Sequence, residues 1–219
     1  MKALAFDAYG TLFDTHSIVA ACEANFPGKG DALSRLWRSK QLEYTWLLSL
    51  MGKYEDFWSV TARALRFSCG ALGLKLTGTT EMALLAGYYR LEPFPDTRPA
   101  LQALSNYRLA ILSNGSPAML HALVANAGLG SAFEKVFSVD AVKVYKPSPK
   151  AYQLTCDRLS LEPPQIGFVS GNSFDVTGAS RFGLTTFWCD RNGLPLDELD
   201  AQPALRITSL EELAKALSG

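Results

Sequence analysis

The chain has 219 residues, 48% of them hydrophobic, and its 21 Lys and Arg side chains balance 21 Asp and Glu side chains. This composition supports a packed core rather than a disordered chain, and the length suits one large domain or a core with a smaller insert. The charge balance provides no basic surface for nucleic acid or for an anionic membrane.

No apolar run approaches the roughly 20 residues that a membrane-spanning helix needs. The residues from Met1 to Leu4 lead directly into an apolar stretch, which leaves no room for a signal peptide. The 4 cysteines form no C-x-x-C motif, and the 2 histidines are too few for a typical zinc site. We therefore expect a cytoplasmic protein with reduced thiols and no membrane contact.

The first element in the chain is a short apolar run from Ala3 to Phe6, which predicts a buried parallel strand. Asp7 ends this run, and Gly10 follows shortly after. Ligands bind beyond the carboxyl ends of strands in an open α/β sheet, and an aspartate placed there can attack an electrophile to form a covalent ester. Taken alone, the pattern is equally typical of an aspartate that caps a turn.

The segment after the first strand has a helical pattern. Cap residues precede a helix that we predict from about Ser17 to Phe26. From about Asp31 to Arg90, apolar side chains recur at helical spacing without strand-like alternation. The proline-containing stretch 93–96 marks the end of this region. We therefore predict a helical cap insert over residues 16–92.

The rest of the chain alternates strands with helices. The predicted strands are Arg108–Leu112, Ile166–Val169 and Thr185–Trp188, with a short apolar stretch at Val136–Val139. The predicted helices start near Pro99, Pro117 and Pro149, and after a capping box formed by Ser209 and Glu212. This alternation predicts an α/β fold in which segments 1–15 and 93–219 form a Rossmann-like, doubly wound parallel sheet with helices on both faces.

Polar residues lie at four places where an active site is expected. These places are Asp7, Ser113-Asn114, Lys146 and the stretch from Ser170 to Asp175. Three of them follow apolar strands, and the lysine lies in a loop. Because strand ends converge on one crevice in a doubly wound sheet, the order Asp, Ser, Lys, Asp is a more specific signal than any one position.

The stretch Asp7-x-Tyr9-Gly10-Thr11-Leu12-Phe13-Asp14 resembles the first motif of the haloacid dehalogenase superfamily. This motif and the order of the four polar positions are similar to those of the L-2-haloacid dehalogenases (type II). The resemblance extends over essentially the whole chain. The resemblance implies an (S)-2-haloacid dehalogenase that hydrolyses short L-2-haloalkanoic acids through an aspartyl ester, giving (R)-2-hydroxyacids and halide. It also implies a homodimer and a reaction without a cofactor.

The resemblance assigns the displacement step to residues from both predicted segments. Asp7 is the nucleophile, and Thr11 orients it. Arg38, from the helical insert, binds the leaving halide with Asn114 as its partner. The alternative for Arg38 is a solvated arginine on a helix surface, which is the usual environment of that residue type.

A second group of residues is implied for hydrolysis of the ester. Lys146 neutralises and positions Asp7, while Ser170, Asn172 and Asp175 hold that lysine and the hydrolytic water. Without the lysine, two carboxylates and an anionic substrate would repel one another. Considered singly, Lys146 is typical of a surface lysine, and Asp175 is also placed to be a helix N-cap.

The remaining residues that the resemblance implies bind the substrate. Ser113 donates to the substrate carboxylate, with backbone N–H groups near Tyr9 and Asn114, and Tyr152 is a further hydrogen-bond partner. The apolar wall around the alkyl group is formed by Tyr9, Leu42, Phe57 and Phe174. Each of these apolar side chains, taken alone, is more often a plain core residue.

The chain departs from related sequence patterns at positions that bear on metal binding and on pocket shape. Type II dehalogenases commonly have serine at Gly171 and tryptophan at Phe174. The phosphatase branch of the superfamily has an aspartate, its acid/base, where this chain has Tyr9, and a carboxylate for magnesium where it has Asn172. The chain therefore lacks two oxygen-rich features of a magnesium site. We therefore expect no metal. A magnesium-dependent small-molecule phosphatase and a non-catalytic binding protein remain the alternatives.

Overall fold

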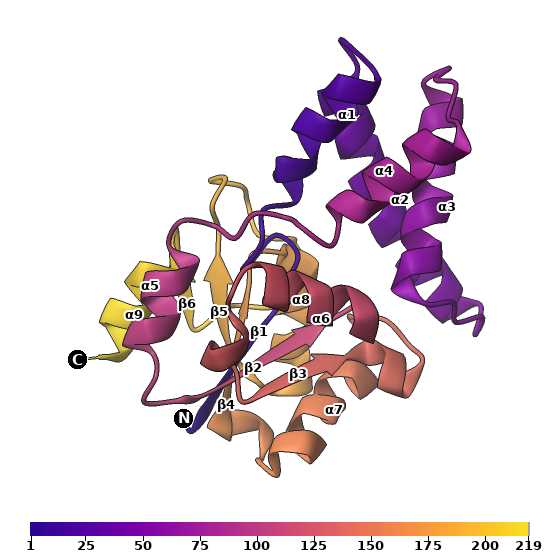
Figure 1. Ribbon diagram of the computed structural model, residues 1–219. Coiled ribbons are helices and arrows are strands. Elements are labelled where there is room, and N and C mark those ends of the chain that lie inside the picture. The colour runs from indigo at the N-terminus through magenta and orange to yellow at the C-terminus, as the bar shows by residue number, and fades with distance from the viewer. Residues whose placement is uncertain (219) are drawn as a thin grey trace.

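The computed structural model describes residues 1–218, so Gly219, the last residue of the predicted core, lies outside it. Within these residues, six parallel strands form one sheet in the order β3-β2-β1-β4-β5-β6 (Figure 1). The strands are β1 (Ala3–Phe6), β2 (Arg108–Ser113), β3 (Lys135–Ser138), β4 (Ile166–Ser170), β5 (Thr185–Cys189) and β6 (Leu205–Ile207). This is the strand order of the Rossmann fold, and it confirms the predicted fold class.

Helices connect and cover the strands of the core. They are α5 (Thr97–Ala103), α6 (Pro117–Asn126), α7 (Pro149–Leu159), α8 (Ser173–Phe182) and α9 (Leu210–Leu217), with short 3₁₀ turns η2 (Gly130–Ala132), η3 (Val139–Val142) and η4 (Pro163–Gln165). Helix α5 packs against α9, and α7 packs against α8. Right-handed crossovers on either side of β1 place these two pairs on opposite faces of the sheet.

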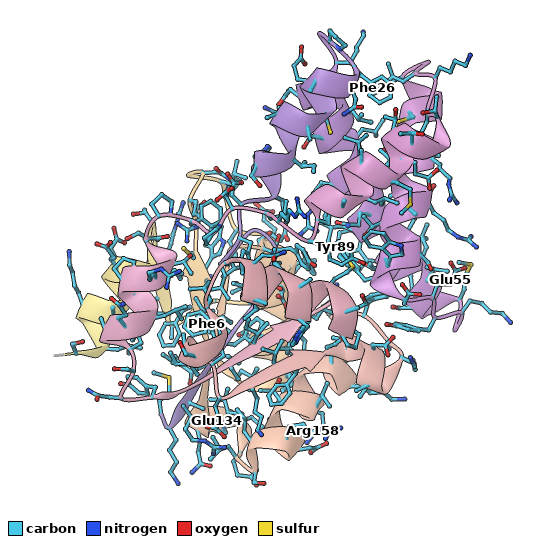
Figure 2. The ribbon with its side chains drawn as sticks, viewed as in Figure 1. Phe6, Phe26, Glu55, Tyr89, Glu134 and Arg158 are labelled. Carbon is cyan, nitrogen blue, oxygen red and sulfur yellow. The ribbon has the colours of Figure 1, made fainter. Side chains whose placement is uncertain are left out.

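The middle strand β1 sets the position of the site. All four of its residues are buried, which agrees with a strand covered on both faces. Phe6 lies level with Ile111 of β2 and Val169 of β4, so the next residue leaves the sheet between the ends of those strands. Figure 2 shows Phe6 inside the core, whereas Glu134 lies at the outer surface. The strand order changes direction at β1, and ligands bind at such a switch point.

The segment between β1 and α5 is helical. It contains η1 (Thr15–Ile18), α1 (Val19–Asn25), α2 (Gly30–Leu50), α3 (Phe57–Ala71) and α4 (Gly78–Gly87), which stand together beyond one end of the sheet in Figure 1. The chain enters and leaves this group side by side, because Asp14 N–H donates to Glu92 O and Phe94 N–H donates to Leu12 O. We propose that residues 16–92 form a cap on the core.

Two local predictions are wrong, and one strand was missed. The helix predicted from Ser17 to Phe26 is divided into η1 and α1, because the Asp14 carboxylate accepts from His16 N–H and starts a tight turn first. Strand β6 was not predicted, since two of its three residues are exposed and it has no apolar run. The capping box at Ser209 is incomplete, because the Glu212 carboxylate accepts from Thr208 N–H instead.

None of the helices within residues 1–218 has the length and apolar character that crossing a membrane requires.

Candidate active site

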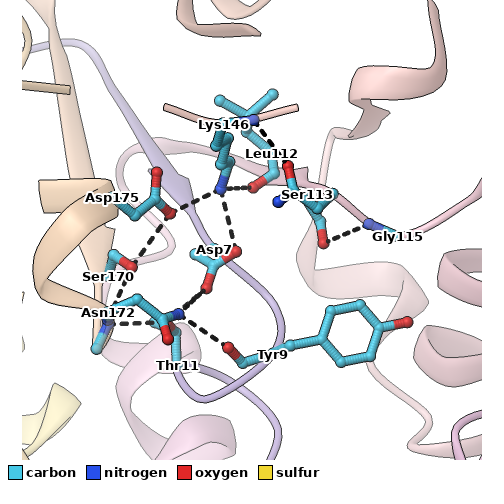
Figure 3. Close-up of polar contacts among 12 residues, drawn as sticks. Asp7, Tyr9, Thr11, Leu112, Ser113, Gly115, Lys146, Ser170, Asn172 and Asp175 are labelled. Carbon is cyan, nitrogen blue, oxygen red and sulfur yellow. Dashed lines mark hydrogen bonds and ion pairs between the residues drawn. The ribbon is translucent and has the colours of Figure 1, made fainter. Parts of the chain in front are cut away.

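The polar positions selected from the sequence meet at the carboxyl end of β1 (Figure 3). Asp7 directly follows β1, and Asn114 directly follows β2. Lys146 lies in the loop before α7, and Asn172 lies between β4 and α8. Arg38 reaches the same place from α2, where its guanidinium donates to the backbone carbonyl of Tyr9. The site is therefore built from both segments of the chain.

Lys146 is the centre of the polar cluster. Its ammonium donates to Asp7 Oδ1 at 3.0 Å, to Asp175 Oδ2 at 2.8 Å and to Leu112 O at 2.6 Å. Three protons meet three acceptors, so the buried cation is fully hydrogen-bonded. Lys146 is only 1% exposed, which rules out its alternative interpretation as a surface lysine.

Burial and charge act in opposite directions on the ionisable groups of this cluster. Burial disfavours the ammonium of Lys146, but the attraction of Asp175 and Asp7 outweighs it and raises the pKa of the lysine above its ordinary value. Burial raises the pKa of Asp175 to about 6, although Lys146 opposes the shift. Both groups are therefore charged at neutral pH, and Asp175 titrates much closer to neutrality than an ordinary carboxylate.

The carboxylate of Asp7 is held on both oxygens. Oδ2 accepts from Thr11 Oγ1 at 3.1 Å and from Asn172 Nδ2 at 2.8 Å, while Oδ1 accepts from Lys146. All three donors to this carboxylate within residues 1–218 are side chains, so the alternative of a turn-capping aspartate is wrong. A carboxylate has about four acceptor positions, and the position left over is on Oδ1.

The β4–α8 turn packs closely against the turn that follows Asp7. Gly171 N–H donates to Thr11 Oγ1 at 2.8 Å. A Cβ atom at Gly171 would lie 2.3 Å from the carbonyl oxygen of Gly10, so a serine at this position would push the two turns apart. The glycine that departs from the family pattern thus has a packing reason in this chain.

The side chains around Asp7 enclose a cavity of about 10 Å³. This volume accommodates about one water molecule. The cavity is lined by Asp7, Tyr9, Arg38, Leu42, Phe57, Asn114, Lys146, Asn172, Phe174 and Asp175. Every one of them belongs to the residues singled out from the sequence. A larger surface hollow of about 850 Å³ lies beside α6 and β3, but it lacks the buried charges found around Asp7.

Four other residues singled out from the sequence lie next to the residues that line the cavity. Thr11 supports Asp7, as described, and Ser170 Oγ donates to Asp175 Oδ2 at 3.2 Å. Tyr152 OH donates to Asp175 Oδ1 at 2.8 Å, so its hydroxyl faces that carboxylate. Ser113 is fully buried, and its Oγ accepts from Gly115 N–H at 3.1 Å.

The side chain of Asp175 does not cap helix α8. Asn172 occupies the N-cap position of that helix, and Asp175 lies within the first turn. The Asp175 carboxylate is directed toward Lys146 and Ser170 (Figure 3), and it also accepts from Tyr152 OH. The alternative of an N-cap is therefore wrong.

Sequence reasoning missed three contributors to the site. The carbonyl oxygen of Leu112 accepts a hydrogen bond from Lys146, and no side-chain pattern signals such a backbone acceptor. Gln41 accepts from Arg38 Nη1 at 2.7 Å and donates to Thr61 Oγ1 at 2.7 Å. The spacing of Arg38 and Gln41 on one helix face could have indicated the first contact, whereas Thr61 comes from the next helix.

In the part of the chain that the structure describes, no group of three or more His, Cys, Asp or Glu side chains is arranged to hold a metal ion. Lys146 Nζ lies between the carboxylates of Asp7 and Asp175, and the Asn172 side chain that donates to Asp7 is an amide rather than a carboxylate.

Comparisons with known proteins agree on one family. A family model described as haloacid dehalogenase-like hydrolase matches residues 1–183. The (S)-2-haloacid dehalogenase of Pseudomonas sp. (strain YL) is 46% identical over 217 residues, covering 98% of this chain and 94% of the relative. Haloacetate dehalogenase H-2 of Moraxella sp. (strain B) is 44% identical over 220 residues, covering 100% of this chain and 98% of the relative.

A solved structure extends this similarity to three dimensions. The L-2-haloacid dehalogenase of Xanthobacter autotrophicus with chloropropionic acid covalently bound has a TM-score of 0.94 and 41% identity. The match covers 100% of this chain and 99% of that one.

Proposed function

This chain belongs to the haloacid dehalogenase-like hydrolases, and from that membership we propose how its site works. The protein hydrolyses the carbon–halogen bond of short L-2-haloalkanoic acids through an aspartyl-ester intermediate, giving (R)-2-hydroxyacids and halide. The observation that carries the assignment is the Asp7 carboxylate, held by Lys146, Thr11 and Asn172 at the wall of this small cavity.

In the first step, Asp7 displaces the halide. A lone pair on Oδ1, the oxygen with an acceptor position left over, attacks C2 of the substrate, and the carbon–halogen bond breaks on the opposite side. The attack inverts C2 and leaves the acyl chain as an ester of Asp7. Arg38 and Asn114 line the same cavity and stabilise the negative charge that develops on the halide.

In the second step, water hydrolyses the ester. Its oxygen attacks the carbonyl carbon of Asp7, and the bond between that carbon and the product oxygen breaks. Asp175 accepts a proton from the water, because its pKa of about 6 makes it a base near neutral pH, and passes it to the departing product oxygen. The second proton of the water is released to solvent as Asp7 becomes a carboxylate again. Ser170 and Asn172 hold the geometry, and Lys146 stabilises the charge on Asp7.

The substrate is held at its two ends. Its carboxylate receives hydrogen bonds from Ser113 and from backbone N–H groups near Tyr9 and Asn114. Ser113 Oγ already accepts from Gly115 N–H, so its own proton is available for the substrate. The alkyl group packs against the apolar side chains of the cavity, which are Tyr9, Leu42, Phe57 and Phe174.

We propose that the reaction needs no metal or other cofactor. The phosphatase branch uses acidic residues at the positions of Tyr9 and Asn172. Burial raises the pKa of Tyr9, so its hydroxyl does not serve as a general base at neutral pH. Asn172 donates to Asp7 through its amide, an interaction that a carboxylate would replace with repulsion. The residues of the site therefore favour a dehalogenase over a magnesium-dependent phosphatase.

We also propose that the protein is a cytoplasmic homodimer. All four cysteines are free and buried, which suits a reducing compartment. Exposed apolar side chains gather where α2 ends, at Leu47, Leu50 and Met51.

The test is halide release from each enantiomer of 2-chloropropionate in EDTA, with p-nitrophenyl phosphate and magnesium assayed alongside. We expect chloride from the S enantiomer only and no phosphate. An Asp7→Asn variant is expected to lose at least about 10⁴-fold in turnover, because an amide is a poor nucleophile. Magnesium-dependent phosphate release without chloride would overturn the proposal, and so would wild-type turnover by a variant whose asparagine is intact by mass spectrometry.

A further inference from the structure

The guanidinium of Arg38 has only neutral partners. Nη1 donates to Gln41 Oε1 at 2.7 Å, and Nη2 donates to Tyr9 O at 3.3 Å. Over residues 1–218, no carboxylate lies within ion-pair distance of this half-buried arginine. Other arginines of the chain, such as Arg191, pair with aspartates. Arg38 therefore keeps its positive charge uncancelled beside the cavity.

The orientation of the Gln41 amide follows from its second partner. Thr61 Oγ1 donates its one proton to Phe57 O at 2.6 Å, so its oxygen acts as an acceptor toward Gln41. Gln41 must then direct its NH₂ group toward Thr61 and its carbonyl oxygen toward Arg38, at 2.7 Å on each side. Gln41 and Thr61 are both fully buried, so water does not compete for these bonds.

We propose that Gln41 is a positioning residue that aims the Arg38 guanidinium at the leaving halide without neutralising it. The inference rests on the proposed role of Arg38. Arg38 is a long side chain on the proposed cap, whereas Asp7 belongs to the core. The position of the Arg38 guanidinium therefore depends on a rigid contact within the cap. Gln41 and Arg38 are neighbours on one face of α2, and Thr61 ties that face to α3.

The chemistry explains why an amide suits this position better than a carboxylate. A glutamate of the same length would also accept from Arg38, and more strongly. It would, however, form an ion pair whose negative charge opposes a halide anion in the same cavity. The neutral amide supplies the geometry alone.

The experiment compares Gln41→Glu with the wild-type enzyme in single-turnover measurements that separate halide release from ester hydrolysis. We expect halide release to slow about 10- to 100-fold, the range typical of residues that orient a functional group. The inhibition constant of added bromide is expected to rise, and the rate of ester hydrolysis to stay within twofold. A purely structural role would affect both steps and would leave bromide inhibition unchanged.

Lys40→Gln is the matched control. It changes the charge of the same helix by the same one unit, but Lys40 pairs with Glu43 away from the cavity. We expect its halide release to stay within twofold of wild type. An equal loss in this control would show that the total charge of the helix matters rather than the contact with Arg38, and would overturn the proposal.

Thr61→Val provides a second test if Gln41→Glu does not fold. It keeps the shape of Thr61 and removes the acceptor that orients the Gln41 amide. We therefore expect slower halide release and weaker bromide inhibition, both by smaller factors than in Gln41→Glu. Unchanged halide release in whichever variant folds would overturn the proposal. An Arg38→Lys variant distinguishes an error about Arg38 from an error about Gln41. If Arg38→Lys leaves halide release unchanged, the proposed role of Arg38 is wrong. If Arg38→Lys slows halide release but the Gln41 and Thr61 variants do not, only the proposed role of Gln41 is wrong.

Discussion

At the scale of single residues, Lys146 holds the site together because it separates two buried carboxylates. Lys146→Met keeps the length of the side chain and removes its charge. We expect a loss of about 3–5 kcal/mol in the free energy of unfolding, the usual result of breaking a buried ion pair. Lys150→Met, on the exposed side of the same region, is expected to change stability by no more than about 0.5 kcal/mol.

The loss of stability in the Lys146→Met variant is expected to increase as the pH rises. Without Lys146, nothing opposes the burial and the Asp7 charge that raise the pKa of Asp175, so the folded-state pKa of Asp175 lies still further above that of the unfolded chain. The folded variant then binds protons more tightly, so its stability falls as pH rises from about 4 toward neutrality. Chemical denaturation at pH 5 and pH 8 measures this, and a deficit that is larger at pH 5 would contradict it.

We expect Asp175 to set the acid limit of activity. Its pKa is raised to about 6 by burial, and only the ionised form accepts a proton from water. We expect the rate of ester hydrolysis to fall about tenfold for each pH unit below 6, and to be level above it until another group titrates. Single-turnover rates from pH 4.5 to 8 check this. A limb centred near pH 4 would mean that Asp175 titrates as an ordinary carboxylate.

At the scale of elements, the loop between α2 and α3 fastens the proposed cap to the core. Tyr54 OH donates to Asp140 Oδ1 at 2.9 Å, and Tyr145 OH donates to Glu55 O at 2.6 Å. The rings of Tyr54 and Tyr145 also pack together, with centroids 5.1 Å apart. These contacts join the α2–α3 loop to η3 and to the loop before α7.

Removing one of these contacts is expected to loosen the loop. Tyr54→Phe deletes a hydrogen bond worth about 1 kcal/mol, so amide exchange over residues 51–56 should rise about fivefold. Hydrogen–deuterium exchange by mass spectrometry measures it. Tyr107→Phe, which deletes a hydroxyl bond to Leu217 O on the core, is the control and should leave this loop unchanged. Equal exchange in the Tyr54 variant and the wild type would show that the contact does not restrain the loop.

At the scale of the whole molecule, the exposed apolar residues at the end of α2 bear on the proposed homodimer. Leu50 is 85% exposed and Met51 is 61% exposed, and monomers rarely leave such side chains clustered in water. We expect sedimentation of the wild type at twice the mass of one chain, and weaker self-association for Leu50→Lys. Met82→Lys replaces another exposed apolar residue, 63% exposed, on α4 and should not change the mass. A wild-type monomer at micromolar concentration would refute the dimer.

The sheet shows which strands can be predicted from local sequence patterns. Strands β1, β2, β4 and β5 were predicted to within a residue or two, because each is a short apolar run buried on both faces. Strand β6 has no such run, since only Ile207 of its three residues is buried. It is a strand because β5 offers a free edge beside it, and that edge exists only in the folded sheet.

The sequence by itself determined the α/β class and the helical character of the segment after the first strand, because apolar runs and helical spacing are local signals. The residues to which the family resemblance assigns the chemistry stay predictions, although the structure brings them together at the end of β1. Only the tertiary structure decided their partners. Lys146 meets Asp7 across 139 positions of sequence, and Thr61 orients Gln41 from another helix. Such contacts depend on strand register and helix packing, so they become defined only when the chain is folded.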